Sequence, residues 1–327
     1  MMMRLALLCR GVALAAFLGV LSWHGGAAAA PKEIVYITAK LDLPFWSTMG
    51  KGVESAALAN GYAYSVMDSQ LNPQTQLQHA RDAIARGVAG IVISPVDSQT
   101  APDTLELARK AGVPVVIADI GTNSGQYVSY IKSDNYRGAY EVGAAVAAAL
   151  KEKGWQGDPF ALVTISLARK NGQDRTNGFR DAMKDAGITH EGGLRQMQNY
   201  SAEETSGYVK SLLAATPRLR SIFIETDQPT MGALHTIKAA KRQNELLIGS
   251  FDAMPEVAAL LKAGPLVACG MQQPYLMGAK AAEALVDSLH GKAPAKQIMV
   301  PILVATSKNV EQLMPVANKT VFGIGAR

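Results

Sequence analysis

Residues 34–64 have the sequence IVYITAKLDLPFWSTMGKGVESAALANGYAY. The first residues are continuously apolar or β-branched, a pattern typical of a parallel strand that is covered on both faces. A turn with Pro44, Phe45 and Trp46 follows, and then a segment of helical length that ends at the Asn-Gly pair 60–61, where a left-handed backbone is tolerated. This order predicts a strand that ends in an aromatic turn, then a helix, then a second strand.

The same alternation of strand and helix recurs along the rest of the chain. Apolar runs predict a first series of strands at 34–38, 62–67, 90–94, 114–118 and 127–131, and a second series at 160–165, 221–225, 246–251 and 266–271. The order helix, Ala-Gly-Val or Ala-Gly-Ile, strand occurs at 111–113 and again at 186–188. Repeated βαβ units of this kind predict an α/β fold with parallel sheets.

Helix starts are marked by short polar and proline motifs. Asn72-Pro73 and Ala101-Pro102 are two such starts. The first strand series ends at residues 132–135, and an alanine-rich helix is expected over 136–151, with Asp134 well placed to cap it. Because the chain has no Gly/Ser-rich or proline-rich linker, we expect it to pass between domains through short crossings such as the one at 132–135.

The first 30 residues have the features of a secretory signal peptide. Arg4 and Arg10 flank the start of an apolar run, which gives way to four alanines at 27–30 before Pro31. Cleavage after Ala30 is the simplest interpretation. The alternative is an N-terminal membrane anchor, but the apolar core has about 11 residues, whereas a spanning helix needs roughly 20. The sequence therefore predicts an exported protein that reaches the periplasm through a cleaved signal peptide.

Composition limits the classes of partner. Without residues 1–30 the chain has 297 residues, enough for two domains, with 30 basic and 27 acidic residues. A net charge of +3, with the basic residues spread along the chain, does not predict a nucleic-acid-binding surface. Only Cys269 then remains of the two cysteines, so no intramolecular disulfide is expected.

The motifs that identify common enzymes and cofactor sites are not found. There is no GxGxxG after a strand, no GxxxxGK[ST], no GxSxG, no HExxH and no CxxC. The histidines show no metal-ligand spacing. The sequence therefore favours a binding protein, without a cofactor or a metal, over an enzyme.

Polar or aromatic residues follow several strands, and in doubly wound sheets ligands bind outside the carboxyl ends of the strands. These residues are Asp42, Phe45, Trp46, Asp119, Arg175, Asp227, Asp252 and Gln272. Carboxylates accept hydrogen bonds, a guanidinium group donates them and an amide does both, so the set suits a small molecule rich in hydroxyl groups. Aromatic rings suit the apolar faces of a sugar.

Each of these residues also has a structural alternative. The aromatic pair suits a hydrophobic core at the start of a helix, and the aspartates suit turns or helix caps. Arg175 suits a surface pair with Asp174 or Asp181 on a helix.

The order of these residues along the chain resembles that of the periplasmic sugar-binding proteins of the ribose-binding type. The resemblance covers nearly all of residues 33–305. The matching phrases, in family order, are Pro44-Phe45-Trp46, Asp68-Ser69-Gln70, Asn72-Pro73, Ile93-Ser94-Pro95-Val96-Asp97-Ser98, Ala118-Asp119, Ser133-Asp134-Asn135, Arg175-Thr176-Asn177-Gly178-Phe179, Thr226-Asp227, Met231-Gly232-Ala233-Leu234, Gly249-Ser250-Phe251-Asp252 and Gln272-Gln273-Pro274.

The resemblance implies a type I periplasmic binding protein fold, with two doubly wound parallel-sheet lobes joined by three short hinge crossings. It implies an N-terminal lobe of residues 31–133 and 272–301 and a C-terminal lobe of residues 134–271 and 302–327. The ligand contacts that it implies are Phe45 and Trp46 near the sugar plane, Tyr200 as a stacking aromatic from the second lobe, and Asp119, Arg175, Asp252 and Gln272 on hydroxyl groups.

The function that the resemblance implies is the capture of a sugar or sugar derivative and its delivery to the membrane permease of an ABC importer. One alternative is a sensory binding protein whose bound form is recognised by a membrane histidine kinase or chemoreceptor. A periplasmic enzyme is the third class, and the missing motifs disfavour it.

The chain departs from the ribose-binding pattern at four polar positions. Leu43, Ser94, Ile120 and Thr226 stand where ribose binders have other polar groups. Because a buried hydroxyl without a partner costs about 1 to 3 kcal/mol, ribose itself is expected to fit badly. Either the ligand has an apolar or deoxy portion there, or Lys40 and Asp42, which lie on one face of the strand end, supply a different polar pattern.

Overall fold

The computed structural model of this chain describes residues 32–325. The predicted signal peptide, residues 1–30, lies outside the described residues. Within residues 32–325, no helix combines the length and the apolar character needed to cross a membrane.

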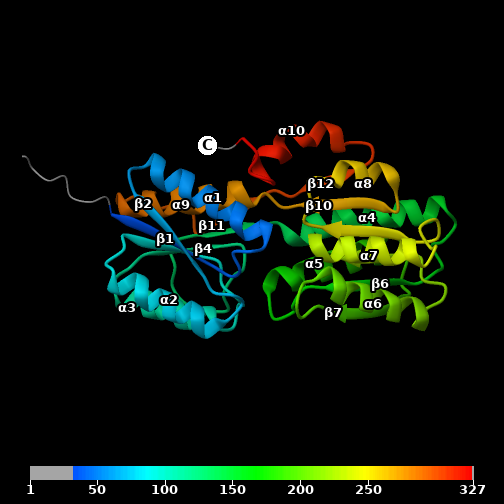
Figure 1. Cartoon of the computed structure of the whole chain (residues 1–327), viewed down its shortest axis with the longest axis horizontal. Helices are drawn as coiled ribbons and strands as arrows, with labels where there is room; N and C mark the ends of the chain where they lie inside the picture. The colour runs from blue at the N-terminus through cyan, green and yellow to red at the C-terminus, as the bar shows by residue number, and fades with distance from the viewer. Residues whose placement is uncertain (1–31, 326–327) are drawn as a thin grey trace, which may run out of the picture. The chain divides into compact units, whose positions relative to one another are not determined.

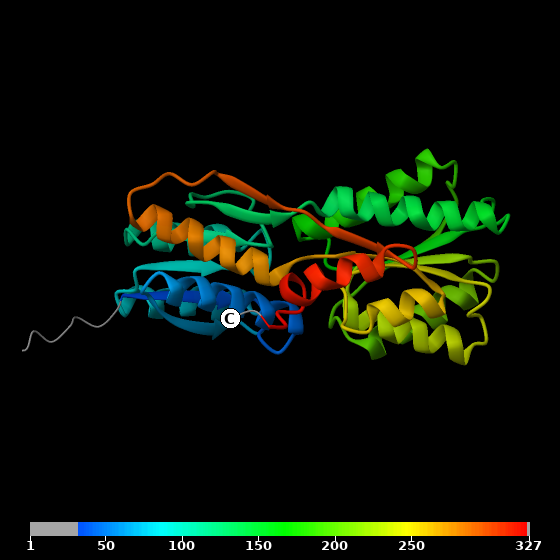
Figure 2. The same ribbon diagram turned by 90° about the horizontal axis from the view of Figure 1, so that it is seen from above.

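These residues form two six-stranded sheets, each with helices packed on both faces (Figures 1 and 2). The first sheet has the strand order β11-β5-β4-β3-β1-β2, and the second has the order β12-β10-β9-β8-β6-β7. In the described residues every neighbouring pair of strands is parallel except β10 and β12. We call each sheet with its helices a lobe.

The first lobe contains one strand from late in the chain and one late helix. Its elements are β1 (Glu33–Thr38), α1 (Pro44–Ala59), β2 (Ala63–Asp68), α2 (Pro73–Ala85), β3 (Gly90–Ile93), α3 (Ala101–Lys110), β4 (Val115–Ala118), β5 (Tyr130–Ser133), α9 (Pro274–Leu289) and β11 (Gln297–Val300).

The second lobe contains the remaining elements. They are α4 (Asn135–Glu152), β6 (Phe160–Thr164), α5 (Lys170–Asp185), β7 (Glu191–Gln196), α6 (Ala202–Ala215), β8 (Ser221–Ile224), α7 (Asp227–Ala239), β9 (Leu247–Phe251), α8 (Val257–Ala263), β10 (Leu266–Met271), β12 (Leu303–Thr306) and α10 (Val310–Thr320).

Helix ends follow the predicted capping signals. The Asn72 side chain accepts hydrogen bonds from the backbone amides of Gln74 and Thr75, and the Asp134 side chain accepts one from Arg137. The predicted helix over 136–151 is observed as α4, one residue longer at each end. Both predicted starts are therefore confirmed, because in each case a side-chain oxygen occupies donors that the first helical turn leaves free.

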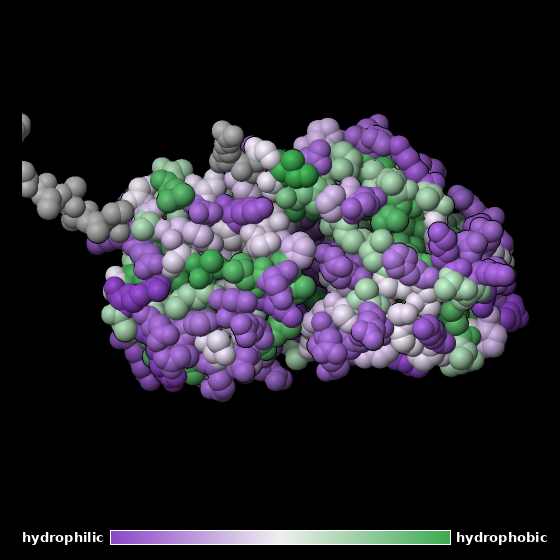
Figure 3. Space-filling model, viewed as in Figure 1, coloured by the Kyte–Doolittle hydropathy of each residue, from purple (hydrophilic) through white to green (hydrophobic). Residues whose placement is uncertain are grey.

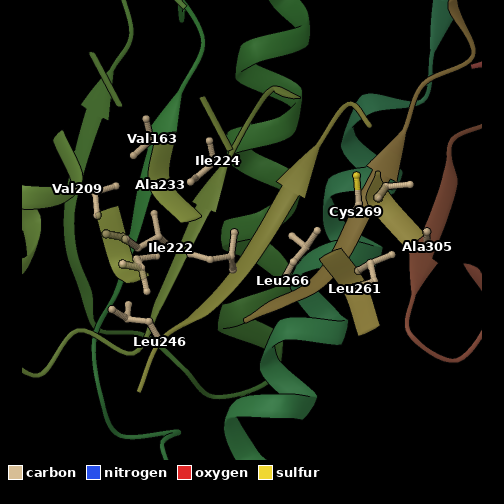
Figure 4. Close-up of a cluster of buried hydrophobic side chains, with 14 of the residues drawn as sticks. Val163, Val209, Ile222, Ile224, Ala233, Leu246, Leu261, Leu266, Cys269 and Ala305 are labelled. Atoms are coloured by element: carbon tan, nitrogen blue, oxygen red, sulfur yellow. The ribbon is translucent and has the colours of Figure 1, made fainter. Parts of the chain in front are cut away.

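Alternate side chains of each strand enter different cores. In the second lobe Val163 and Ile224 pack with α6 and α7, whereas Leu162 and Phe223 pack with α4 and α5 on the opposite face of the sheet. Cys269 lies in the first of these two cores and is 1% exposed (Figure 4). Two apolar faces on one sheet explain the continuously apolar strands of the sequence.

Short segments carry the chain between the two sheets. Within residues 32–325 it passes between them three times, from β5 to α4, from β10 to α9 and from β11 to β12. The first passage is the one predicted at 132–135. The predicted fold class, two parallel-sheet α/β lobes joined by three short crossings, is confirmed.

Three edge strands are missing from the sequence prediction. β7 contains two glycines and is only half-buried, so it lacks an apolar run, and β11 and β12 have four residues each on either side of Pro301. The strand predicted at 127–131 is observed at Tyr130–Ser133, where β11 and β4 supply its partners. Edge strands need fewer apolar residues than central ones, which is why periodicity alone does not find them.

Candidate ligand-binding cleft

The carboxyl ends of several strands from both lobes meet at one cleft, and Figure 3 shows a recess between the lobes on the face that it views. The residues that line the cleft are Leu43, Phe45, Trp46, Leu71, Asp119, Ile165, Arg169, Asn171, Arg175, Tyr200, Thr226, Asp227, Asp252 and Gln272. Nine of the residues that the sequence predicts for the site are among them: Phe45, Trp46, Asp119, Arg175, Tyr200, Thr226, Asp227, Asp252 and Gln272. The structure thus gathers most of the predicted set in one place.

The first lobe supplies the aromatic wall. Phe45 and Trp46 begin α1 and meet edge to face, with ring centroids 4.9 Å apart. Trp46 is only 6% exposed and packs in the core of the first lobe, whereas Phe45 is half-buried. Trp46 therefore combines the two roles that its position in the sequence allows, because it is a core residue and also lines the cleft.

Arg175 is held firmly at the base of the second lobe. Its Nε donates to Asn135 Oδ1 (2.9 Å), and its Nη1 donates to the Glu225 carbonyl oxygen (2.7 Å) and to Asp252 Oδ2 (3.3 Å). The guanidinium group also lies 4.1 Å from the centroid of the Phe251 ring. At 2% exposure Arg175 is not a surface partner of Asp174 or Asp181; it is a fixed donor whose position does not depend on a ligand.

Two buried oxygen atoms at the cleft have no hydrogen-bond partner in the described part of the chain. They are Asp119 Oδ1 and Gln272 Oε1. The other oxygen of the Asp119 carboxyl accepts from Asn171 Nδ2 (3.3 Å), and Gln272 Nε2 donates to Asp252 Oδ1 (2.7 Å). A buried acceptor without a donor is costly, so both atoms are suited to the hydroxyl donors of a ligand.

Burial disfavours the ionised form of two carboxyl groups of the cleft, those of Asp119 and Asp227. Burial raises the pKa of Asp119 to about 6; the positive charge of Arg175 opposes this shift and the negative charge of Asp252 adds to it. Burial, with Asp252 again contributing, raises the pKa of Asp227 to about 6. The acidic groups outnumber the fixed Arg175 beside them, and their oxygen atoms form a surface that accepts hydrogen bonds from neutral ligands.

A fourth carboxyl group lies beneath the cleft. The Glu225 side chain is fully buried, where it accepts from the hydroxyl of Thr176 (2.7 Å) and the backbone amide of Ile165 (3.0 Å). Burial raises the pKa of Glu225 to about 8, against the opposing effects of the Thr176 hydrogen bond and the Arg175 charge. These hydrogen bonds link Glu225, at the end of β8, to α5 and to the residue that follows β6.

The backbone of the cleft is strained at several residues. Left-handed φ angles occur at Leu71 (57°), Asp119 (68°), Tyr200 (56°) and Asp252 (59°), all of which line the cleft. A residue with a side chain adopts this conformation at a cost of about 1 to 3 kcal/mol, and such strain concentrates at functional sites.

Sequence reasoning missed several lining residues. Arg169 and Asn171 follow β6, so the rule that polar residues after strands face the ligand applies to them as well. Both reach the other lobe, because Arg169 Nε donates to the Val96 carbonyl oxygen (3.1 Å) and Asn171 donates to Asp119. The aliphatic residues Leu71 and Ile165 carry no such signal.

Three predicted contact residues lie elsewhere. Ser94 is fully buried in the first lobe, where its hydroxyl lies 2.9 Å from the Tyr36 hydroxyl. The half-buried Lys40 and the exposed Asp42 form a pair whose charged atoms are 3.8 Å apart, and neither lines the cleft. Ile120 also points into the core, whereas Leu43 does line the cleft. The missing polar contacts are therefore not replaced by Lys40 and Asp42 in this arrangement.

The chain matches a known protein family along most of its length. A family model described as a periplasmic binding protein domain matches residues 34–293. The ribose import binding protein of Salmonella typhimurium is 29% identical over 293 residues, which cover 89% of this chain and 94% of that protein. The D-apiose import binding protein of Paraburkholderia graminis is 31% identical over 277 residues, 84% of this chain and 86% of that protein.

Solved structures share the fold. A carbohydrate transporter solute binding protein from Agrobacterium radiobacter, in complex with D-arabinose, has a TM-score of 0.83 at 20% identity and covers 90% of this chain and 100% of its own. A Caulobacter myo-inositol binding protein with bound myo-inositol has a TM-score of 0.77 at 24% identity and covers 87% and 98%.

Proposed function

The chain belongs to the periplasmic binding protein family, and from that premise we propose that it captures a sugar or sugar-like small molecule between its two lobes and delivers it to the membrane permease of an ABC importer. The first moving body is residues 31–133 with 272–301, and the second is residues 134–271 with 302–327. The protein reaches the periplasm by export, with residues 1–30 removed as a signal peptide.

One observation carries the proposal. Asp119 and Gln272, from the first lobe and a crossing, present buried acceptors that have no partner among residues 32–325, and Arg175 and Asp252 of the second lobe pair at the same cleft. Hydroxyl groups of a sugar satisfy such acceptors, and the rings of Phe45 and Trp46 suit its apolar faces. The relatives described above are named as import binding proteins, which supports an importer over a sensor kinase as the partner.

The test is a ligand screen on the purified protein. D-ribose, D-apiose, D-allose, D-arabinose and myo-inositol are compared by thermal shift, followed by calorimetry. A true ligand at 100 times its Kd should stabilise the protein by about 2.7 kcal/mol and be recovered chemically unchanged. D-ribose is expected to be a weak member of the set, because Leu43 lines the cleft.

Substitutions assign the effect to the cleft. Asp119→Ala and Trp46→Ala should each weaken binding by roughly 1.5 to 3 kcal/mol, since one removes an acceptor and the other a ring face. Asp103→Ala, at an exposed position on α3, is the matched control. Turnover of the ligand to a product, or unchanged affinity in both variants, would contradict the proposal.

A further inference from the structure

A second cavity adjoins the cleft. It has a volume of about 490 Å³ and shares Phe45, Asp227, Asp252 and Gln272 with the cleft, so these side chains form a common wall. The cleft itself has a volume of only about 50 Å³. Small-molecule sites usually have 300 to 1,000 Å³, so a ligand that reaches the cleft residues must extend past the shared wall into the second cavity, whose volume is in that range.

Most of the lining of this cavity is apolar. The apolar residues are Pro44, Phe45, Met231, Ala253, Met254, Pro255, Pro274, Val321 and Phe322. The two methionines are flexible and polarisable, so they adapt to groups of different shape. Such a lining suits a hydrocarbon or aromatic group. A second sugar ring would find few hydrogen-bond partners there.

The charges around the cavity have one sign. Its ionisable lining residues are Asp227, Asp252 and Glu256, and no lysine, arginine or histidine of residues 32–325 lines it. Arg175 is committed to Asp252 from the cleft side. An anionic group placed here meets carboxylates without a compensating cation, so phosphate or carboxylate substituents are disfavoured.

The C-terminal segment closes the cavity. Val321 and Phe322 follow α10 of the second lobe, and the chain then meets the first lobe, since a Cβ at Gly323 would lie 3.3 Å from Cγ2 of Thr48 (Figures 1 and 2). The family model matches residues 34–293, so this wall is built by residues outside the match. The cavity therefore owes its closure to a part of this chain that the family model does not describe.

We propose that the second cavity binds an uncharged apolar substituent of the sugar held in the cleft, so that the ligand class is an alkyl or aryl glycoside. This inference rests on the proposed function of the cleft. It assigns the hydroxyl groups to Asp119, Arg175 and Gln272 and the substituent to Met231, Met254 and Phe322. The shared wall of Phe45, Asp252 and Gln272 is where the glycosidic bond lies.

The experiment compares each free sugar with its glycosides by calorimetry. The probes are D-ribose, D-allose and D-glucose, their phenyl β-glycosides and the corresponding 4-carboxyphenyl β-glycosides. The phenyl glycoside of at least one sugar should bind about tenfold more tightly than the free sugar, because the ring leaves water for an apolar cavity. The 4-carboxyphenyl compound should lose that advantage, because its carboxylate meets Asp227 and Glu256.

Two variants locate the substituent. Met231→Ala and Phe322→Ala should each bring the affinity for the phenyl glycoside to within about twofold of that for the free sugar. Using both variants keeps the test decisive if one of them fails to fold. Val316→Ala, on α10 at 49% exposure, is the control and should keep the full preference.

The outcomes separate the two proposals. If free sugars bind and phenyl glycosides bind no better, or if the preference survives both substitutions, the second cavity does not hold the substituent and only this inference fails. If neither the sugars nor their glycosides bind, the proposed function of the cleft fails together with it.

Discussion

Glu225 shows how a single buried residue can set the pH dependence of this protein. Its pKa is raised from 4.5 to about 8, so the folded protein keeps a proton that the unfolded chain releases near pH 4.5. The free energy of unfolding should therefore fall as the pH rises from about 4.5 to about 8, and then level off. Glu225→Gln, which cannot ionise, should remove this contribution.

The measurement is urea unfolding of the parent and the variant at several pH values. Relative to that of the parent, the free energy of unfolding of Glu225→Gln should rise by roughly 2 to 4 kcal/mol between pH 5 and pH 8, since one pKa unit is worth about 1.4 kcal/mol. Glu283→Gln, at an exposed position on α9, serves as the control. A difference between Glu225→Gln and the parent that does not change with pH would show that the buried carboxyl ionises normally.

A polar residue that follows a strand is predicted to contact the ligand, because ligands bind outside the carboxyl ends of the strands. The prediction holds only where the side chain also faces the cleft. Asp119 and Asp252 lie directly after β4 and β9, so their place at the cleft could be predicted from the sequence. Ser94 also follows a strand, yet its short side chain turns into the core to meet Tyr36, and nothing in the sequence distinguishes that outcome. Asn171 lies at the start of α5, several residues past β6, so its contact with Asp119 depends on the path of the loop between β6 and α5.

At the scale of elements, α1 and α9 cross at very close range. A Cβ at Gly278 would lie 2.1 Å from the carbonyl oxygen of Met49, and a Cβ at Gly52 would lie 2.1 Å from that of Tyr275. Each helix thus presents a glycine to the backbone of the other. Gly278→Ala should destabilise the protein by about 1 to 3 kcal/mol, because the backbones must separate to admit the methyl group.

The matched control is Gly207→Ala on α6. Nothing lies within 4 Å of a Cβ at Gly207, so this change should be neutral or should stabilise the protein by about 0.5 to 1 kcal/mol. Urea unfolding of both variants checks the comparison. Equal effects at the two glycines would mean that helix propensity, rather than the close crossing, determines the cost.

Elements with strong local signals could be predicted, and those stabilised by their neighbours could not. Asn72 and Asp134 cap α2 and α4 with their own side chains, so the starts of these two helices could be predicted from the sequence. β7 exists because β6 offers it a partner edge, and its sequence, EGGLRQ, has weak β propensity. Such a strand forms because a neighbouring strand supplies its hydrogen-bond partners.

At the scale of the whole molecule, hydrogen bonds from two side chains of the second lobe reach the first lobe across the cleft. Arg169 Nε donates to the carbonyl oxygen of Val96, and Asn171 donates to Asp119. These bonds favour the closed arrangement before a ligand arrives. Arg169→Ala should therefore shift the unliganded protein toward an open state and weaken ligand binding by about 1 kcal/mol.

Solution scattering provides the measurement. The Arg169→Ala variant without ligand should have a larger radius of gyration than the parent, and a saturating ligand should reduce the difference. Arg137→Ala, which removes an exposed pair with Glu141 on α4, is the control. An unliganded Arg169→Ala variant with the same radius of gyration as the parent would show that the Arg169–Val96 bond does not hold the lobes together.

The buried cysteine of the second lobe has a practical consequence for following lobe closure with attached reporter groups. Cys269 is the one cysteine within residues 32–325, and burial raises the pKa of its thiol to about 12. The thiolate is the form that attacks a maleimide, so the buried, protonated Cys269 should not react with maleimides. Two cysteines introduced at the surface, one on each lobe, can therefore be labelled selectively with fluorophores or spin labels to measure the distance between the lobes. Cys269 need not be replaced.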